Sequence, residues 1–209
     1  MTTDPHGNQP VLHRGPQPTD ARLTAILVHG RGASAEDILA LAQEFAARDV
    51  AYLAPQAAGH SWYPYSFLQA IAKNEPGITS GLTKIATIIA SLEQQGVAAD
   101  RVVLLGFSQG ACLALEFAAR YARRYGGIVG LSGGVIGPPG TPRDYAGTLE
   151  GTPAFLGCSD IDPHIPVARV HETAEVLTRL GAAVDERIYP GMGHLVNADE
   201  IAAVNAILS

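Results

Sequence analysis

Cysteine is scarce in this sequence, with only Cys112 and Cys158 among 209 residues. Two thiols do not make the disulfide framework of a secreted protein, so a reducing, cytoplasmic compartment is expected. Cys112 lies in an apolar stretch and is expected to pack in the core. The first residues contain neither the basic start nor the apolar stretch of a signal peptide. No apolar run reaches the roughly 18 residues of a membrane span, so no membrane segment is expected.

Charged residues are also few, at 16% of the chain, and the 20 acidic residues outnumber the 14 basic ones to give a net charge of −6. An acidic chain without a basic patch excludes nucleic acid as a partner. No histidine or cysteine spacing resembles a metal site, and no cofactor or metal is expected. With 47% hydrophobic residues, the chain has enough apolar surface to fold around a core.

Glycine and proline, by contrast, are frequent, at 23 and 14 residues, and they separate short apolar segments. Residues 1–20, which contain four prolines, predict a tail or a first strand, and residues 21–209 predict a single domain. Strands are expected at 23–29, 50–54, 101–105, 127–131, 153–156 and 184–189. Helices are expected over 35–48, over 78–92, after residue 108, over 167–180 and over 198–208.

This alternation of strands and helices is typical of βαβ units, whose right-handed crossovers place helices on both faces of a sheet. The sequence therefore predicts an α/β fold with a doubly wound, mostly parallel sheet. The two long connections, 56–76 and 132–152, are too short to form a separate lid domain. In such a sheet ligands bind beyond the carboxyl ends of the strands, so candidate functional residues are sought there.

One of these strand ends carries the pattern Gly-x-Ser-x-Gly at residues 106–110, which is typical of a nucleophile elbow. Strong helix formers follow Ser108, as an elbow requires. The same letters recur at residues 130–134, but the prolines and glycines after Ser132 exclude a helix there. The context therefore favours Ser108 as the nucleophile and assigns Ser132 to a turn.

A serine hydroxyl needs a base, and the base needs an acid to orient it. The loop after the strand at 153–156 offers Asp160 and Asp162, and the loop after the last strand offers His194. The chain order serine, acid, histidine is the order of α/β hydrolases. His164, in the same loop as the aspartates, is expected to face solvent or the rim of the site. The residues alone leave open which aspartate is the acid.

Four stretches of the sequence resemble the phospholipase/carboxylesterase family of α/β hydrolases, which includes acyl-protein thioesterase-like enzymes. The stretches are His-Gly-Arg-Gly at 29–32, the elbow at 106–110, Asp-x-Asp-Pro-x-Ile-Pro at 160–166, and Gly-His at 193–194. The resemblance implies an α/β-hydrolase fold reduced almost to its core. It also places the catalytic acid at Asp162 and an oxyanion hole at the backbone N–H groups of Arg31 and Gln109.

The sequence departs from the family at two of these positions. Arg31 stands where the family commonly has an apolar residue, and its side chain is expected to narrow or charge the acyl pocket. Ser159 stands where a glycine is often found. Four aromatic residues of the long loop are candidate substrate-binding residues that would form a pocket wall or a short lid, with ordinary loop packing as the alternative: Trp62, Tyr63, Tyr65 and Phe67.

The expected function is a serine hydrolase that cleaves carboxylic esters through an acyl-enzyme on Ser108, with His194 as base and Asp162 as its orienting acid. Short or medium acyl esters are favoured, and thioesters and lysophospholipids are further candidate substrates. One alternative is a lactone hydrolase resembling dienelactone hydrolases, although these generally carry cysteine at the elbow. Another is a ligand-binding domain without turnover. A small-molecule ester is the expected partner, and a monomer or homodimer the expected state.

Overall fold

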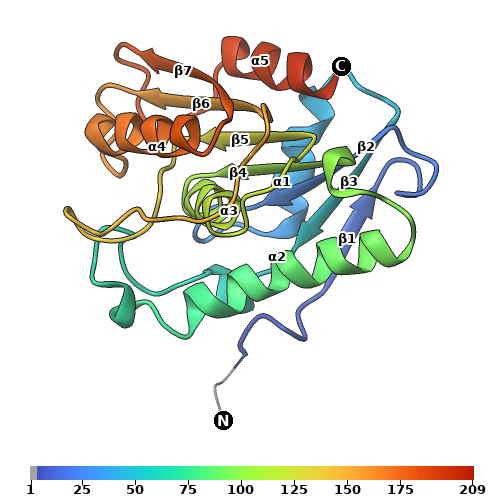
Figure 1. The fold of residues 1–209 in the computed structure, drawn as a ribbon, viewed down its shortest axis with the longest axis horizontal. Helices are drawn as coiled ribbons and strands as arrows, with labels where there is room; N and C mark the ends of the chain where they lie inside the picture. The colour runs from blue at the N-terminus through green and yellow to red at the C-terminus, as the bar shows by residue number, and fades with distance from the viewer. Residues whose placement is uncertain (1–3) are drawn as a thin grey trace.

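The computed structural model describes residues 4–209, which form one seven-stranded sheet in the order β1-β3-β2-β4-β5-β6-β7 (Figure 1). β1 pairs with β3 in antiparallel orientation, and every other neighbouring pair is parallel. The mostly parallel sheet predicted from the sequence is therefore confirmed. The strands are β1 Val11–Arg14, β2 Leu23–Val28, β3 Val50–Pro55, β4 Val102–Phe107, β5 Gly127–Leu131, β6 Pro153–Ser159 and β7 Ala183–Tyr189.

Helices cover both faces of the sheet, because each has one apolar side that must be buried. One core contains residues of α2, α3 and α4, and a second core, on the other face, contains residues of α1 and α5. The bounds are α1 Ala35–Leu41, α2 Gly77–Gln94, α3 Gln109–Arg120, α4 Val167–Arg179 and α5 Ala198–Leu208. This is the doubly wound arrangement expected from the sequence. None of the helices among residues 4–209 is long and apolar enough to cross a membrane.

The helix expected over 35–48 is shorter in the structure. α1 ends at Leu41, a 3-10 turn follows over Ala42–Glu44, and Phe45 is extended with φ −81° and ψ 137°. This backbone places Phe45 in the core at 1% exposure, with its ring 6.2 Å from that of Tyr52. Burying an aromatic ring stabilises the fold more than another helical turn would.

Residues 1–20 were expected as a tail or a first strand, and within the described part a strand forms over Val11–Arg14. The residues before it are also held in place. His6 is 2% exposed, and its backbone N–H donates to Ser80 on α2 over 2.9 Å. Lys84, one turn later, donates to the carbonyl of Gly7 over 3.0 Å. The start of the described chain is thus packed against α2.

Candidate active site

The turn between β4 and α3 holds Ser108 in a backbone conformation that non-glycine residues rarely adopt, with φ 55° and ψ −120°. Two glycines allow the turn to close. A Cβ at Gly106 would lie 2.3 Å from the carbonyl oxygen of Gly110, and one at Gly110 would lie 2.0 Å from that of Val28. The strand-turn-helix context expected of a nucleophile elbow is therefore present at Ser108.

Ser132, which carries the same sequence pattern, also has a positive φ of 52°, but its surroundings differ. Its side chain is fully buried, and its hydroxyl has no hydrogen-bond partner within residues 4–209. The chain that follows is irregular until β6, so no helix begins there. Ser132 lies in the turn that follows β5, as predicted from the prolines after it.

Three side chains from three different strand ends meet in one line of hydrogen bonds. The Ser108 hydroxyl lies 2.9 Å from Nε2 of His194, and Nδ1 of His194 lies 2.7 Å from a carboxylate oxygen of Asp162. The second Asp162 oxygen accepts the backbone N–H groups of His164 and Ile165. Burial raises the pKa of Asp162, but these hydrogen bonds outweigh it and hold the pKa below its ordinary value. Asp162 is therefore a stable carboxylate beside the imidazole.

The neighbouring aspartate and serine hold the loop that carries His194. The Asp160 carboxylate accepts the N–H of Gly191 over 2.7 Å, and the buried Ser159 hydroxyl accepts the N–H of Gly193 over 3.0 Å. Asp160 thus braces the loop, and only Asp162 contacts the imidazole. Ser159, a departure from the family pattern, supplies a hydrogen bond that a glycine there would lack.

The backbone N–H groups of Arg31 and Gln109 have no hydrogen-bond acceptor within residues 4–209. Gln109 is the first residue of α3, where N–H groups are left over and the helix dipole favours negative charge. Gly30 lies close to the elbow, since a Cβ there would be 3.4 Å from that of Ser108. Both amides are thus available to a ligand, as an oxyanion hole requires.

His29 supports the turn that carries Arg31. Its ring is fully buried, with Nδ1 2.8 Å from the carbonyl of Gly30, and Nε2 accepts the N–H of Ala57 over 3.1 Å. Burial lowers the pKa of His29, so the ring is neutral near pH 7. His29 therefore acts here as a structural bridge between two loops.

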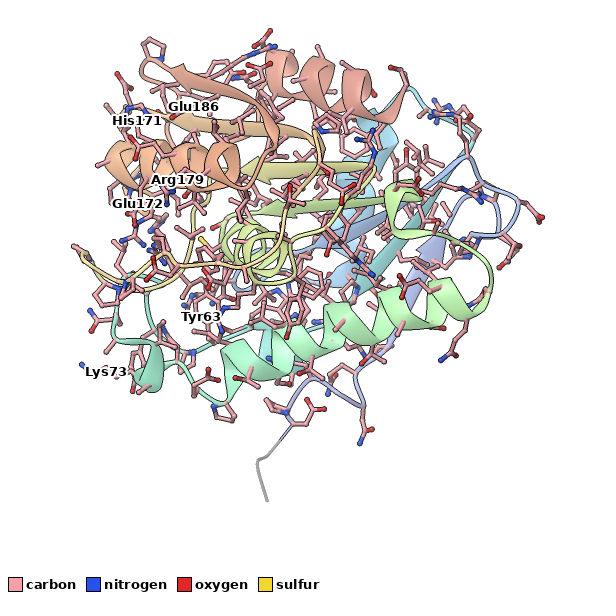
Figure 2. All side chains as sticks on the ribbon, viewed as in Figure 1. Tyr63, Lys73, His171, Glu172, Arg179 and Glu186 are labelled. Carbon is pink, nitrogen blue, oxygen red and sulfur yellow. The ribbon has the colours of Figure 1, made fainter. Side chains whose placement is uncertain are left out.

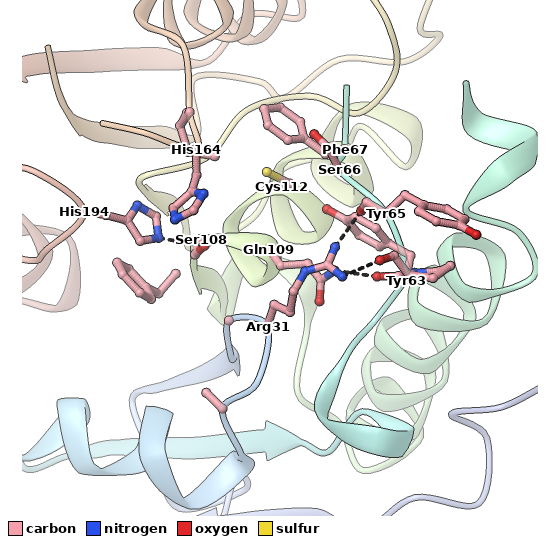
Figure 3. Close-up of a pocket in the computed structure, with 15 residues that line it drawn as sticks. Arg31, Tyr63, Tyr65, Ser66, Phe67, Ser108, Gln109, Cys112, His164 and His194 are labelled. Atoms are coloured by element: carbon pink, nitrogen blue, oxygen red, sulfur yellow. Dashed lines mark hydrogen bonds between the residues drawn. The ribbon is translucent and has the colours of Figure 1, made fainter. Parts of the chain in front are cut away.

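The side chains of Arg31 and Gln109 both bind one segment of the long loop, residues 61–65. The Gln109 amide accepts the N–H of Trp62 over 2.9 Å and donates to the carbonyl of Tyr63 over 2.8 Å. The Arg31 guanidinium donates to the carbonyls of Pro64 and Tyr65, each over 2.6 Å (Figure 3). Arg31 and Gln109, whose backbone N–H groups are available to a ligand, are thus both hydrogen-bonded to residues 61–65.

A cavity of about 510 Å³ opens beside Ser108, within the usual size range of small-molecule sites. Three of the four expected aromatic residues line it, namely Tyr63, Tyr65 and Phe67. Trp62 does not, because its ring is fully buried and its indole N–H donates to the carbonyl of His29. The remaining lining residues are Gly30, Arg31, Ala33, Pro64, Ser66, Phe107, Ser108, Gln109, Cys112, His164, Ile165 and His194.

Cys112 lies on the cavity wall as well as in the core, which its apolar surroundings in the sequence did not indicate. Cys112 follows Ser108 by four residues, which is about one helical turn. This spacing could have predicted that Cys112 lies on the same side of the helix as Ser108. Burial raises the pKa of the Cys112 thiol to about 12, so the thiol stays protonated. His164 stands at the rim, as expected, with its ring edge-on to His194 at 4.9 Å. Within residues 4–209 no three His, Cys, Asp or Glu side chains are grouped to hold a metal ion.

The chain belongs to the phospholipase/carboxylesterase family, whose profile matches residues 15–209. A solved phospholipase/carboxylesterase from Dyadobacter fermentans is 39% identical, with a TM-score of 0.93 over 97% of both chains. The structure of esterase PE8 is 25% identical, with a TM-score of 0.77 over 96% of both chains. These matches support an α/β-hydrolase fold and a hydrolase of the esterase type.

Curated relatives of the chain are named acyl-protein thioesterase 1. The protein from Yarrowia lipolytica is 27% identical over 87% of this chain and 88% of its own length. The protein from Gibberella zeae is 30% identical over 68% of this chain, and the match spans only 62% of its own length.

Proposed function

We propose that this protein hydrolyses carboxylic esters by acyl transfer to Ser108. The observation that carries the proposal is the line of hydrogen bonds from Ser108 through His194 to Asp162, at 2.9 and 2.7 Å. These are the distances at which a base takes a proton from a nucleophile and an acid orients the base. A small-molecule ester is the substrate, and the cytoplasm is the proposed location.

In the first half of the reaction, Ser108 Oγ attacks the ester carbonyl while His194 Nε2 takes the hydroxyl proton. The carbonyl oxygen becomes negatively charged and accepts the N–H groups of Arg31 and Gln109. His194 then gives the proton to the leaving alcohol, and the carbon–oxygen bond to that alcohol breaks. Asp162 keeps the imidazole oriented and stabilises its charged form.

In the second half, His194 takes a proton from a water molecule, whose oxygen attacks the acyl-enzyme carbonyl. The bond to Ser108 breaks, His194 returns the proton to Oγ, and the carboxylic acid leaves. Short or medium acyl groups are favoured, because the connections 56–76 and 132–152 are too short to form a lid domain over the cavity.

The test is hydrolysis of p-nitrophenyl butyrate together with labelling by a fluorophosphonate probe. Wild type should turn over the ester and label at Ser108, whereas Ser108→Ala should not label and should lose roughly 1,000-fold or more in kcat. Ser132→Ala is the matched control, since it removes the other serine of the same pattern and should still label. Wild-type activity in Ser108→Ala would overturn the proposal, and absence of labelling in the folded wild type would favour a binding module.

Thioester cleavage is the second candidate, because the curated relatives are named acyl-protein thioesterases. The same line of residues serves both reactions, since a thiolate leaves more easily than an alkoxide. Comparing butyryl thioesters with butyryl oxygen esters of matched leaving-group pKa decides between them. A kcat/KM at least tenfold higher for the thioester would assign the thioesterase activity.

A further inference from the structure

The cavity beside Ser108 is lined by positively charged and neutral side chains, in a chain whose net charge is −6. No Asp or Glu belongs to its lining in the described part of the chain, whereas Arg31 does. Asp162, which is bonded to the lining residue His194, has a fully buried side chain that also accepts two backbone N–H groups. The charge presented to a substrate is therefore positive.

The Arg31 guanidinium is the source of that charge, and within residues 4–209 it forms no ion pair. Two arginines outside the cavity lining differ in this respect. Arg143 and Arg169 both pair with Glu172, each over 2.8 Å. Figure 2 shows Glu172 on α4. The carboxylate of Glu172 thus neutralises part of their charge, whereas no carboxylate pairs with Arg31 in the described residues.

Arg31 is also held in position before any substrate binds. Its bonds to the carbonyls of Pro64 and Tyr65 fix the guanidinium plane, which lies 6.0 Å from the centre of the Tyr63 ring. Figure 3 shows the guanidinium between this segment and Ser108. A guanidinium has five N–H donors, and these two bonds leave donors free for a carboxylate. A fixed cation with free donors and no counter-ion is the usual recognition element for an anionic group.

We infer that the preferred substrates are esters that carry a carboxylate on the acyl part, bound by the Arg31 guanidinium while Ser108 attacks the ester carbonyl. Monoesters of dicarboxylic acids are the substrate class with this chemistry. The inference rests on the proposed esterase function and names the substrate for it. It gives the Arg31 side chain a role separate from that of its backbone N–H.

The test uses pairs of p-nitrophenyl esters of adipic and suberic acid, in which the far carboxyl is either free or capped as a methyl ester. The readout is the ratio of kcat/KM for the free and capped members within each enzyme, which cancels any loss of active protein. Wild type should prefer the free carboxylate by about tenfold, a modest effect because Arg31 is exposed to solvent. The preference should shrink at about 0.5 M salt, because the screening length there is only a few ångströms.

Arg31→Met should remove the preference, and Arg31→Lys should keep part of it, since lysine retains the charge but not the planar fork. Arg123→Met is the matched control, because it removes the same charge from an exposed ion pair with Glu93 outside the cavity. That variant should keep the wild-type ratio. Equal rates for free and capped esters in wild type, or an unchanged preference in Arg31→Met, would overturn the inference.

A second measurement needs no variant, because Arg31 also holds the 61–65 segment and its replacement can disturb the site. Adipate should inhibit p-nitrophenyl butyrate hydrolysis by the wild type competitively, at about a tenth of the concentration that neutral adipamide requires. Equal inhibition by both overturns the inference alone. If the wild type does not hydrolyse p-nitrophenyl butyrate at all, the proposed esterase function fails first.

Discussion

Asp160 and Asp162 stand two residues apart and have different surroundings. Asp162 is buried against His194, whereas Asp160 is exposed and accepts one backbone N–H from Gly191. Asp162→Asn should lower kcat by roughly 1,000- to 10,000-fold, because an amide at this position favours the wrong tautomer of the imidazole.

Asp160→Asn is the control for this prediction, since the amide oxygen can still accept the N–H of Gly191. Its kcat for p-nitrophenyl butyrate should stay within about tenfold of wild type. If the two variants lost kcat equally, Asp162 would not be the orienting acid.

Tyr63 has a buried hydroxyl that finds no hydrogen-bond partner within residues 4–209. Leaving such a group unpaired costs stability, so Tyr63→Phe should be neutral or should raise the free energy of unfolding by up to about 1 kcal/mol. Tyr125→Phe is the matched comparison, because that hydroxyl donates to the Tyr121 carbonyl over 2.7 Å. Removing the Tyr125 hydroxyl should lower the free energy of unfolding, measured in urea, by about 1 kcal/mol. A larger loss in Tyr63→Phe would mean that its hydroxyl has a partner.

The positions of the candidate site residues were predictable from the sequence where a motif fixed them in the fold, and less so elsewhere. Ser108, Asp162 and His194 follow strands in a fixed order, and the structure brings these three side chains together. The aromatic loop has no such pattern. Trp62 and Tyr63 are adjacent, yet only Tyr63 reaches the cavity, because Trp62 instead bonds to the turn at His29.

At the scale of elements, hydrophobic periodicity predicted each strand of the parallel part of the sheet. Where a strand ends depends on its contacts with other elements. β6 runs to Ser159, beyond the expected end at 156, because it pairs with β7 along its whole length from Pro153 to Ser159. The sequence after 156 contains glycine, cysteine and serine, so apolar periodicity ends before the strand does. Register against a neighbouring strand is not visible in one segment alone.

The first turn of α5 contains a buried carboxyl that makes stability depend on pH. Glu200 closes a capping box with Asn197, and its side chain packs against Gly157 with one oxygen unpaired. Burial raises the pKa of Glu200 to about 7, against 4.5 in the unfolded chain. The folded state therefore holds this proton more tightly, and the stability it confers is present below pH 4.5 and is lost as pH rises through about 7.

Glu200→Gln should remove this dependence while keeping the cap, since an amide oxygen can still accept the N–H of Asn197. Urea unfolding of the variant at pH 8 should give a free energy about 1–3 kcal/mol above wild type, with no difference at pH 4.5. Glu175→Gln is the control, because Glu175 is exposed on α4. An equal gain at both pH values would show that the charge of Glu200 is not responsible.

At the scale of the whole molecule, the start of the described chain is connected to the candidate active site through contacts that run across the fold. His6 Nδ1 accepts the N–H of Ala58 over 3.1 Å, and its Nε2 lies 2.9 Å from the carbonyl of Trp62. Trp62 in turn binds the side chain of Gln109 beside Ser108. The sequence of residues 1–20 did not predict these contacts. An isolated histidine in a polar segment is not part of a hydrophobic pattern, so its burial cannot be predicted from periodicity.

His6→Ala should therefore affect both stability and turnover. It leaves the N–H of Ala58 without its acceptor, so the free energy of unfolding at pH 7.5 should fall by about 1–3 kcal/mol. The kcat for p-nitrophenyl butyrate should fall as well, because the 61–65 segment that holds Gln109 and Arg31 loses an anchor. His13→Ala, in exposed β1, is the control and should change neither quantity.

The pH dependence of the same variant separates the histidine from its packing. Burial lowers the pKa of His6 below 6.5, so the unfolded chain binds this proton more readily than the folded protein does. The stability linked to His6 is complete above pH 6.5 and is lost as pH falls below that value. Between pH 6.5 and pH 5 the free energy of unfolding should therefore fall less steeply in His6→Ala than in wild type. Parallel curves over that range would mean that His6 is not kept neutral by the fold, and that its part in anchoring the 61–65 segment is packing alone.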